Sequence, residues 1–258
     1  MPEGDTIHLA ARRIRAALAG TVPDEIVTPQ PRHRIERWPE RLAGRRLVAV
    51  DAHGKHMCLR FDGGLTLHSH LRMTGSWGVY EGGQRWRRAR RRAWLVLRRG
   101  ELEVVEFDGP VLELARDARL RADPRLTALG PDILGETFDS PAFLRRLRED
   151  DPTRGIGDAL LEQRTVAGIG NMWKAETCFA VGIDPFRAVA DVSDEEALAL
   201  AAFAREHMAA AAQSGHAARP RAVYRRAGMR CGRCGAKVRS RGQGDDNRTS
   251  YWCPGCQA

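Results

Sequence analysis

Apolar and polar residues follow two different periods in the first half of the chain. From residue 6 to 19 apolar positions recur at helical spacing and Gly20 follows, which predicts an amphipathic helix that ends at this glycine. Short apolar runs then alternate with turn signals such as Asp62-Gly63-Gly64. The predicted strands cover residues 46–51, 57–61, 65–68, 93–97 and 102–107. Strands this short and closely spaced favour a sandwich or barrel over alternating βα units.

The pattern becomes helical after Gly130-Pro131-Asp132. Ser140-Pro141 predicts a helix start, with the serine as N-cap and proline at the first helical position. Three more helices are predicted: over residues 156–164, after Asn171, and from a capping box at Ser193-Asp194-Glu195-Glu196 towards Gln213. The chain is therefore predicted to have an α+β fold in three parts: a β-rich domain over residues 1–132, a helical domain over 133–218 and a cysteine-bearing module over 219–258.

Four of the six cysteines form two Cys-x2-Cys pairs, at Cys231 and Cys234 and at Cys253 and Cys256, with 18 residues between the pairs. This spacing is typical of a zinc ribbon, in which four thiolates hold one structural Zn²⁺ and leave no open position for catalysis. The residues between the pairs predict a β-hairpin, with 237–241 paired to 249–252. The other two cysteines, at positions 58 and 178, are interpreted as ordinary buried thiols.

Length and composition bound the class of protein. The chain has 258 residues, of which 43% are hydrophobic, enough for real cores. No run approaches the roughly 20 apolar residues of a membrane helix. The first residues also lack the layout of a signal peptide, so a cytoplasmic protein without a membrane partner is expected.

Basic charge is concentrated in two segments. The chain carries 42 Lys+Arg against 33 Asp+Glu, a net charge of +9. Residues 219–258 contain ten basic and two acidic residues, and residues 84–99 contain eight arginines and no acid. Clustered basic charge indicates a polyanionic partner, above all nucleic acid. A solvated, arginine-rich surface is the alternative, because 39 of the 42 basic residues are arginine.

The Pro2-Glu3 pair at the N-terminus could carry chemistry. A small residue after Met1 permits removal of that methionine, which leaves proline with a free secondary amine. Such an amine can attack C1′ of a deoxyribose to form an iminium, and a neighbouring carboxylate can move the protons. Taken alone, Met1-Pro2-Glu3 is a weak signal, and an ordinary N-terminus is the favoured interpretation.

Four separated motifs together resemble the formamidopyrimidine-DNA glycosylase/endonuclease VIII family over essentially the whole chain. They are Met1-Pro2-Glu3-Gly4, Gly54-Lys55, Gly168-Ile169-Gly170-Asn171 and the four-cysteine module. The resemblance implies an N-terminal β-sandwich with flanking helices, a helical helix–two-turns–helix domain, and a zinc-finger β-hairpin. The segment from Trp77 to Arg88 is most similar to the actinobacterial endonuclease VIII-like subgroup.

The resemblance implies a role for several side chains. Pro2 would be the Schiff-base nucleophile, Glu3 the proton donor in glycosidic cleavage and Lys55 the proton donor in β-elimination. Arg248 would serve δ-elimination and contact a phosphate. The alternatives are a solvated turn lysine at position 55 and one more basic tail residue at 248.

DNA contacts are implied for three further residues. Asn171 and nearby backbone amides would hold a phosphate at a helix N-terminus, with a plain helix cap as the alternative. The segment His70-Leu71-Arg72-Met73-Thr74-Gly75 resembles the loop that fills the space left by a flipped base. In it Met73 would be the wedge and Arg72 its polar neighbour, although a methionine in an apolar run also suits a core.

The implied activity is that of a bifunctional DNA glycosylase/AP lyase of base excision repair, a bacterial monomer on damaged DNA with one structural Zn²⁺. Glu3-Gly4 and the short segment at residues 214–230 favour oxidised pyrimidines. Two departures leave the lesion open: Asp5-Thr6 lacks a second glutamate, and Leu71-Arg72-Met73 is closer to the formamidopyrimidine branch. The alternatives are the same fold acting on 8-oxoguanine and a non-catalytic zinc-ribbon DNA-binding protein.

Overall fold

The computed structural model describes residues 2–258, so the fate of Met1 lies outside the described residues. The chain divides into two compact units. Unit 1 consists of Pro2 and Thr6–Thr127, and unit 2 of Glu3–Asp5 and Ala128–Ala258. The three-part division expected from the sequence stays a prediction.

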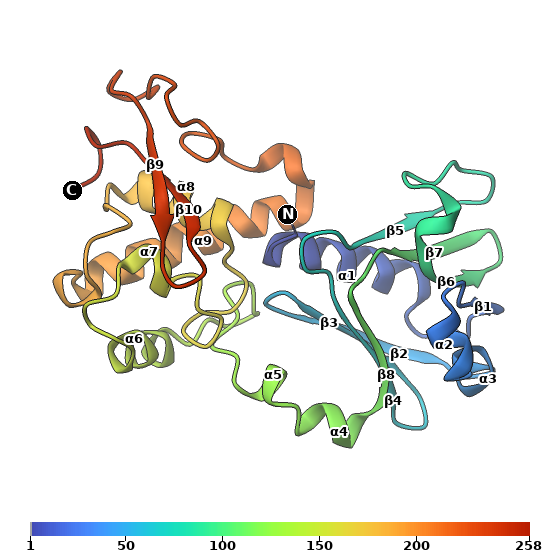
Figure 1. The fold of residues 1–258 in the computed structure, drawn as a ribbon. Coiled ribbons are helices and arrows are strands. Elements are labelled where there is room, and N and C mark those ends of the chain that lie inside the picture. The colour runs from blue at the N-terminus through green and yellow to red at the C-terminus, as the bar shows by residue number, and fades with distance from the viewer. Residues whose placement is uncertain (1) are drawn as a thin grey trace. The chain divides into compact units, whose positions relative to one another are not determined.

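Unit 1 is built on two antiparallel four-stranded sheets, with strand orders β1-β6-β7-β5 and β2-β3-β4-β8 (Figure 1). The strands are β1 Glu25–Val27, β2 Leu47–His53, β3 His56–Phe61, β4 Leu65–His70, β5 Ser76–Tyr80, β6 Ala93–Arg99, β7 Leu102–Phe107 and β8 Val111–Arg116. The helices that go with them are α1 Gly4–Leu18, α2 Pro31–Ile35, α3 Trp38–Leu42, α4 Asp117–Arg121 and α5 Pro124–Thr127, with a 3₁₀ turn at Arg90–Arg92.

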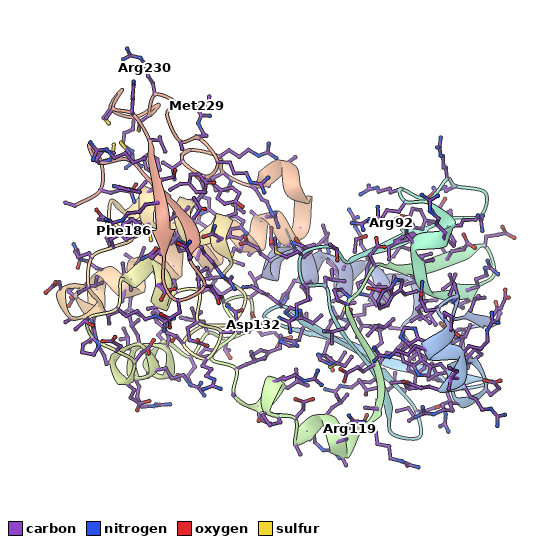
Figure 2. All side chains as sticks on the ribbon, in the orientation of Figure 1. Arg92, Arg119, Asp132, Phe186, Met229 and Arg230 are labelled. Carbon is purple, nitrogen blue, oxygen red and sulfur yellow. The ribbon has the colours of Figure 1, made fainter. Side chains whose placement is uncertain are left out.

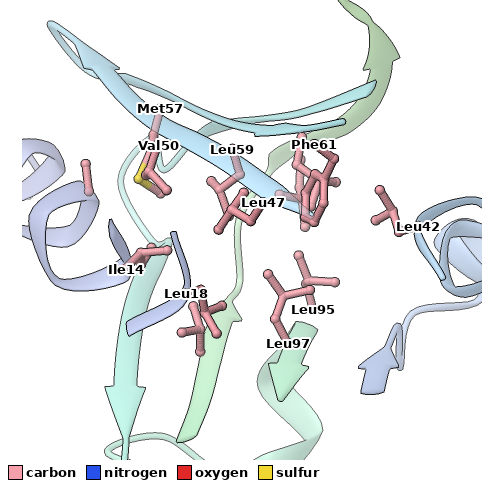
Figure 3. Packing of buried hydrophobic residues seen from close by; sticks show 14 of the residues in the cluster. Ile14, Leu18, Leu42, Leu47, Val50, Met57, Leu59, Phe61, Leu95 and Leu97 are labelled. Carbon is pink, nitrogen blue, oxygen red and sulfur yellow. The ribbon is translucent and has the colours of Figure 1, made fainter. Parts of the chain in front are cut away.

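The core of unit 1 lies between these sheets. Figure 3 shows Leu59 and Phe61 of β3 on one side and Leu95 and Leu97 of β6 on the other, with Leu18 of α1 beside them. All five side chains are at most 2% exposed. The alternation of apolar residues in β3 thus puts one face of its sheet into the core, as its sequence predicts.

Three strands of unit 1 were not predicted. Strand β1 has only three residues, and β5 contains Gly78 and is half-buried over most of its length. Strand β8 follows Pro110 and carries an alternating pattern that supports a strand. The predicted strands all occur, and four of them are longer than expected, because backbone pairing in β2, β4 and β6 continues to His53, His70 and Arg99 and β3 begins one residue earlier, at His56.

Unit 2 is mainly helical and ends in a hairpin (Figure 1). Its helices are α6 Ser140–Glu149, α7 Ile156–Ala159, α8 Asn171–Val181 and α9 Asp194–Ser214, with 3₁₀ turns at Val189–Asp191 and His216–Ala218. The hairpin pairs β9 Arg239–Gln243 with β10 Arg248–Trp252. Buried Trp173 of α8 and Phe143 of α6 belong to the core cluster of this unit.

The helix starts of unit 2 test the capping predictions. At α9 the capping box is confirmed: the Glu196 amide donates to Ser193 Oγ and the Ser193 amide donates to the Glu196 carboxylate. At α6 the prediction of Ser140 as N-cap is wrong. Asp139 is the cap, and its carboxylate accepts from the Ala142 amide at 2.9 Å. A carboxylate one residue earlier replaces the serine hydroxyl as acceptor.

Other boundaries also differ from expectation. The helix expected over residues 156–164 stops at Ala159, and the hairpin expected at 237–241 and 249–252 begins two residues later on its first strand and one earlier on its second. The overall class is confirmed: a β-sandwich with helices, a helical region, and a C-terminal hairpin with four clustered cysteines. Within residues 2–258, none of the helices is long and apolar enough to cross a bilayer.

Candidate functional site

The Glu3 carboxylate is held at the start of helix α8. It accepts hydrogen bonds from the backbone amides of Gly170 at 3.1 Å, Met172 at 2.9 Å and Trp173 at 3.2 Å. The side chain is fully buried. The amides at a helix N-terminus otherwise lack partners and carry positive partial charge, so they stabilise an ionised carboxylate. The amides that could bind an anion at this helix start are therefore occupied by a side chain of the protein itself.

Glycines make this close approach feasible. A Cβ atom on Gly170 would lie 2.3 Å from Glu3 Cδ, and one on Gly4 would lie 2.9 Å from the Gly168 Cα. The Gly4 amide also donates to the Gly168 carbonyl at 2.9 Å. Two motifs separated by more than 160 residues in the sequence therefore meet backbone to backbone, and side chains at these positions would keep them apart.

Asn171 connects helix α8 to the hairpin. Its Nδ2 donates to the Thr249 carbonyl at 2.8 Å, whereas its Oδ1 is buried without a hydrogen-bond partner among the described residues. The alternative of a helix cap is wrong, because Gly170 occupies the N-cap position and Asn171 is the first helical residue. Arg248 stands next to Thr249 on β10, half-exposed, with an ion pair to Asp246 at 2.8 Å.

A buried lysine also joins helix α8 to the hairpin. Lys174 is fully buried, and its Nζ contacts Ser250 Oγ and lies 3.3 Å from Gln243 Oε1. Burial lowers the pKa of Lys174 to about 8. Lys174 was not among the predicted site residues, although it is one of only three lysines in the chain and follows Asn171 closely.

Two carboxylates hold the segment that leads from α9 to the hairpin. Asp5 forms a bidentate ion pair with Arg219, both contacts at 2.6 Å, and the Asp5 side chain is fully buried. Glu176 of α8 accepts from the amides of Ala222, Val223 and Tyr224. Sequence reasoning missed both; it treated Asp5 only as a departure from the family pattern.

Lys55 lies in the two-residue turn between β2 and β3, where His53 pairs with His56. Gly54 has a φ of 56°, which suits glycine at the first central position of a hairpin turn. Next to the turn, burial and then the positive charges of Arg72 and Lys55 lower the pKa of His70 to about 4. His70 is therefore neutral near pH 7 and adds no positive charge beside Lys55.

The segment Leu71–Gly75, here called the wedge loop, projects Met73 outward. Met73 is 65% exposed, which excludes a core role. The Gly75 amide donates to the Leu71 carbonyl at 2.9 Å and closes the loop, and a Cβ on Gly75 would clash with this carbonyl. Arg72 has a φ of 48° and its amide donates to His70 Nδ1 at 3.3 Å.

An ion-pair cluster fixes the far end of the wedge loop. Arg88 donates to the Thr74 carbonyl at 2.7 Å and to the Asp108 carboxylate at 2.5 Å, and Arg92 contacts the same carboxylate at 2.7 Å. Partial burial acts to raise the pKa of Asp108, but the hydrogen bonds from Arg92 and Arg88 outweigh it and lower the pKa. The cluster was not foreseen, because Arg88 is one of eight arginines in its segment.

The four predicted cysteine ligands converge in the hairpin module. Their Sγ atoms all lie within 4.8 Å of one another, with 3.9 Å between Cys231 and Cys256 and 3.4 Å between Cys234 and Cys253. The set could hold a metal ion. Among the described residues it is the one such group of three or more metal-binding side chains.

The predicted site residues are distributed over both units. Pro2, Lys55, Arg72 and Met73 belong to unit 1, and Lys55 and Arg72 both act on His70 there. The other residues belong to unit 2, where Glu3 and Asn171 meet at the start of α8 and Thr249 brings the strand of Arg248 to them. Of the two remaining cysteines, Cys178 is fully buried and Cys58 half-buried.

Comparison with known families gives two matches that cover most of the chain. The profile of the Formamidopyrimidine-DNA glycosylase N-terminal domain matches residues 1–114, and that of the Formamidopyrimidine-DNA glycosylase H2TH domain matches residues 129–220. Among solved structures, a Lactococcus lactis formamidopyrimidine-DNA glycosylase complexed with DNA that contains an oxidised pyrimidine has a TM-score of 0.81. It is 24% identical, with 99% of each chain covered, and thus shares the fold.

Similar curated proteins extend over the full chain. "Probable endonuclease 8 2" of Streptomyces coelicolor is 40% identical, covering 100% of this chain and 94% of the relative. "DNA-(apurinic or apyrimidinic site) lyase Nei2" of Mycolicibacterium smegmatis is 32% identical over 100% and 99% of the two chains. The formamidopyrimidine-DNA glycosylase of Thermus thermophilus is also 32% identical, over 100% and 98%.

Proposed function

Because the chain belongs to the formamidopyrimidine-DNA glycosylase/endonuclease VIII family of DNA glycosylase/AP lyases, we propose that it excises oxidised pyrimidines through a Schiff base on Pro2. After excision it nicks the strand by β,δ-elimination. Its partner is damaged DNA, on which it acts as a monomer in the bacterial cytoplasm. Full-length similarity to an AP lyase and an endonuclease 8 supports the enzyme class.

The observation that carries the proposal is the buried Glu3 carboxylate with its three amide donors. Packing alone does not call for a carboxylate at this position. Removing a carboxylate from water costs free energy unless it is fully hydrogen-bonded. Here the charge is held in one position directly after Pro2 in the chain. A fixed carboxylate beside an amine is what proton transfer during imine chemistry requires.

In the proposed reaction the Pro2 nitrogen forms a bond to C1′ as the glycosidic bond breaks, and the base leaves with the electron pair and takes up a proton from the Glu3 carboxyl group. Glu3 accepts the proton from the Pro2 nitrogen and donates one to the sugar ring oxygen, so that the ring opens to an iminium. Loss of a C2′ proton then expels the 3′ phosphate, and loss of a C4′ proton expels the 5′ phosphate. Water hydrolyses the iminium and frees Pro2; no electrons are exchanged with a cofactor.

Lys55 and Arg248 are assigned to the elimination steps. Lys55, in the tight β2–β3 turn, would exchange protons during β-elimination. Because His70 is neutral, Lys55 and Arg72 supply the positive charge beside this turn, which attracts the phosphate being expelled. Arg248 on the hairpin would hold a phosphate for δ-elimination, and DNA would replace its exposed contact with Asp246. Asn171 ties that strand to α8 through Thr249.

The wedge loop is assigned to the space that a flipped nucleotide leaves. Met73 is exposed on a loop closed at both ends, by the Gly75 amide and by Arg88. An apolar side chain held on such a loop can fill an apolar gap between bases. Arg72 beside it would contact the strand opposite the lesion.

Zinc fits the cysteine set. A tetrahedral Zn²⁺ with Zn–S bonds of about 2.3 Å places sulfur atoms about 3.8 Å apart, close to the 3.9 Å and 3.4 Å of the two measured pairs. Cys231, Cys234, Cys253 and Cys256 would hold the ion, which supplies structural cross-linking of the hairpin. With four thiolates around it the ion would have no position for substrate.

Two features support a pyrimidine lesion over 8-oxoguanine. Gly4 meets the Gly168 backbone too closely for the leucine found in the formamidopyrimidine branch. The segment after α9 is tied down by Arg219 and by the amides of residues 222–224, which leaves it no freedom to form a long loop over a purine. The named relatives include both endonuclease 8 and formamidopyrimidine-DNA glycosylase, so the lesion must be measured.

The test is borohydride trapping on labelled duplexes that carry an abasic site, thymine glycol or 8-oxoguanine. We expect a covalent adduct with the abasic site and with thymine glycol, and a weaker one with 8-oxoguanine. Mass spectrometry of the digested adduct should locate the sugar on the peptide that begins with Pro2. A stronger adduct with 8-oxoguanine would reverse the lesion assignment and leave the amine chemistry in place.

The matched control keeps Pro2 and blocks its nitrogen. One extra residue retained before Pro2 converts the secondary amine into an amide, which cannot form an iminium. This form should lose trapping by at least about 100-fold and still bind an abasic-analogue duplex. Full trapping by the blocked form would exclude Pro2 as the nucleophile.

A further inference from the structure

The loop between β5 and β6 carries several arginines and is anchored by a buried tryptophan. We name residues 83–92 the arginine loop. Its anchor is Trp86, 9% exposed, which packs with Tyr80 and Phe107 and donates from Nε1 to Glu103 at 2.7 Å. The Arg87 amide donates to the Tyr80 hydroxyl at 3.2 Å. The loop is thus fixed by one buried aromatic side chain and its neighbours, while the residues around that side chain face outward.

Four of the eight arginines in residues 84–99 make contacts within unit 1. Arg88 and Arg92 contact Asp108, and Arg98 contacts Glu25 and Glu103. Arg90 lies over the Trp86 ring at 4.6 Å. Three of these arginines therefore pair with carboxylates of the β-sandwich, which stabilises the arginine-rich segment against it.

Three other arginines of the loop make no such contact within residues 2–258. Arg85, Arg87 and Arg91 are exposed, and none has a carboxylate partner among the described residues. The loop itself contains no acid, and residues 83–90 line a hollow of about 680 Å³. Unpaired guanidinium groups on one short loop, with no acid in it, form a local positive charge that favours the binding of an anion.

The arginine loop is joined directly to the wedge loop. Arg88 is its link: the side chain donates to the Thr74 carbonyl, one residue after exposed Met73. A duplex that receives Met73 therefore brings its sugar-phosphate backbone close to the arginine loop. Guanidinium groups match phosphate oxygens in bidentate geometry, which favours a nucleic-acid backbone as the anion.

We propose that Arg85, Arg87 and Arg91 bind the DNA phosphate backbone beside the wedge loop, as an anchoring surface separate from the side chains assigned to the chemistry. The inference rests on the proposed function for its ligand. It adds that the surface is insensitive to the lesion, because phosphates are the same on damaged and intact DNA. It therefore contributes affinity and orientation and leaves base selection to other groups.

The experiment measures affinity for a duplex with a tetrahydrofuran abasic analogue, by fluorescence anisotropy between 50 and 300 mM NaCl. Each lost phosphate contact lowers the slope of log K against log salt by about 0.9, so R85S/R87S/R91S should lower it by about 2–3. Affinity at 100 mM NaCl should fall by at least about 10-fold, equally for damaged and intact duplexes. R85K/R87K/R91K, which keeps the charge, should recover most of the slope.

The matched control removes the same charge elsewhere on unit 1. Arg116, Arg119 and Arg121 are exposed around α4, with no carboxylate partner among the described residues. Figure 2 labels Arg119 at the opposite end of unit 1 from Arg92. R116S/R119S/R121S should keep the wild-type slope.

Three outcomes would overturn the inference. Equal loss of slope in the two serine variants would mean that overall charge acts without a defined surface. An unchanged slope in R85S/R87S/R91S would exclude phosphate contacts by the loop and leave it for an acidic protein partner. Failure of the wild type to bind or trap DNA would reject the proposed function as well, so the two failures are distinguishable.

Discussion

Glu106 is a carboxyl group buried in the interior of unit 1. It lies on β7 opposite Trp77, fully buried, and neither of its oxygens has a hydrogen-bond partner of ordinary geometry within residues 2–258. Burial raises the pKa of Glu106 to about 8, and the neighbouring Gly109 amide opposes this only in part. The residue therefore keeps its proton at neutral pH, and the fold is favoured by the protonated form.

This proton predicts a pH-dependent stability. A raised folded pKa means that the native state holds a proton which the unfolded chain releases above about pH 4.5, so stability is lost as pH rises towards 8. Glu106→Gln should remove that loss and gain on the order of 2–4 kcal/mol over the wild type between pH 5 and 9. Urea unfolding across this range measures it.

The control for Glu106 is Glu101→Gln, which removes an exposed carboxylate close to the β6–β7 turn. Its unfolding free energy should follow the wild-type pH dependence. If the Glu106→Gln and wild-type curves run parallel from pH 5 to 9, then Glu106 is already ionised in the folded protein and the argument fails.

At the scale of elements, the wedge loop depends on a neighbouring turn. Asp108 has a φ of 49°, and its carboxylate holds Arg88 and Arg92 while Arg88 holds the Thr74 carbonyl. Asparagine tolerates the left-handed backbone, so Asp108→Asn removes the charge without straining the turn. The substitution therefore tests the contribution of the ion pairs while the conformation of the turn is kept.

We expect Asp108→Asn to loosen the wedge loop. Hydrogen exchange at the Gly75 amide, now bonded to the Leu71 carbonyl, should accelerate by about 3–10-fold, because partly exposed ion pairs contribute roughly 1 kcal/mol. Excision of an oxidised base should slow by a similar factor. Asp123→Asn, which breaks a comparable pair with Arg125, should leave this amide unchanged; equal acceleration in both variants would contradict the link through Arg88.

At the scale of the molecule, the hairpin module (residues 219–258) is joined to the rest of unit 2 by packing and hydrogen bonds. The core of the module includes Phe179 of α8 and fully buried Cys253. The Cys253 amide donates to Gln257 Oε1, and Gln257 in turn donates to the Ile183 carbonyl. Loss of an ion held by the four thiolates would therefore disturb the end of α8 as well as the hairpin.

Metal removal should act on binding before it acts on the sandwich. Cys253→Ser should lower zinc content from about one ion per chain to near zero and weaken affinity for an abasic-analogue duplex by about 10-fold or more. Elemental analysis and anisotropy measure both. Cys58→Ser, which changes a thiol outside the cluster, should keep both at wild-type values; full zinc content in Cys253→Ser would refute the four-thiolate site.

How much could be predicted from the sequence depends on the distance over which each feature is encoded. The capping box at Ser193 and the strand alternation of β3 were found because their residues are neighbours in the chain. The N-cap of α6 was assigned one residue late because Ser140 and Asp139 are both good caps, and backbone geometry decides between them. Strand β5 was not predicted because most of its residues are half-buried, which weakens the alternation of apolar and polar positions.

The sequence by itself determined the chemistry at hand: a proline and a glutamate at the start, a glycine–lysine turn, and four cysteines at ribbon spacing. These are covalent facts, and a resemblance of four motifs was enough to identify the family. Only the tertiary structure decided which partner each group takes. Glu3 meets α8 across 167 positions and Asp5 meets Arg219 across 214, and Asp108 separates the structural arginines from the unpaired ones. Short-range patterns reflect backbone periodicity, whereas these contacts exist only after the chain has packed and buried charges have found counter-charges or amides.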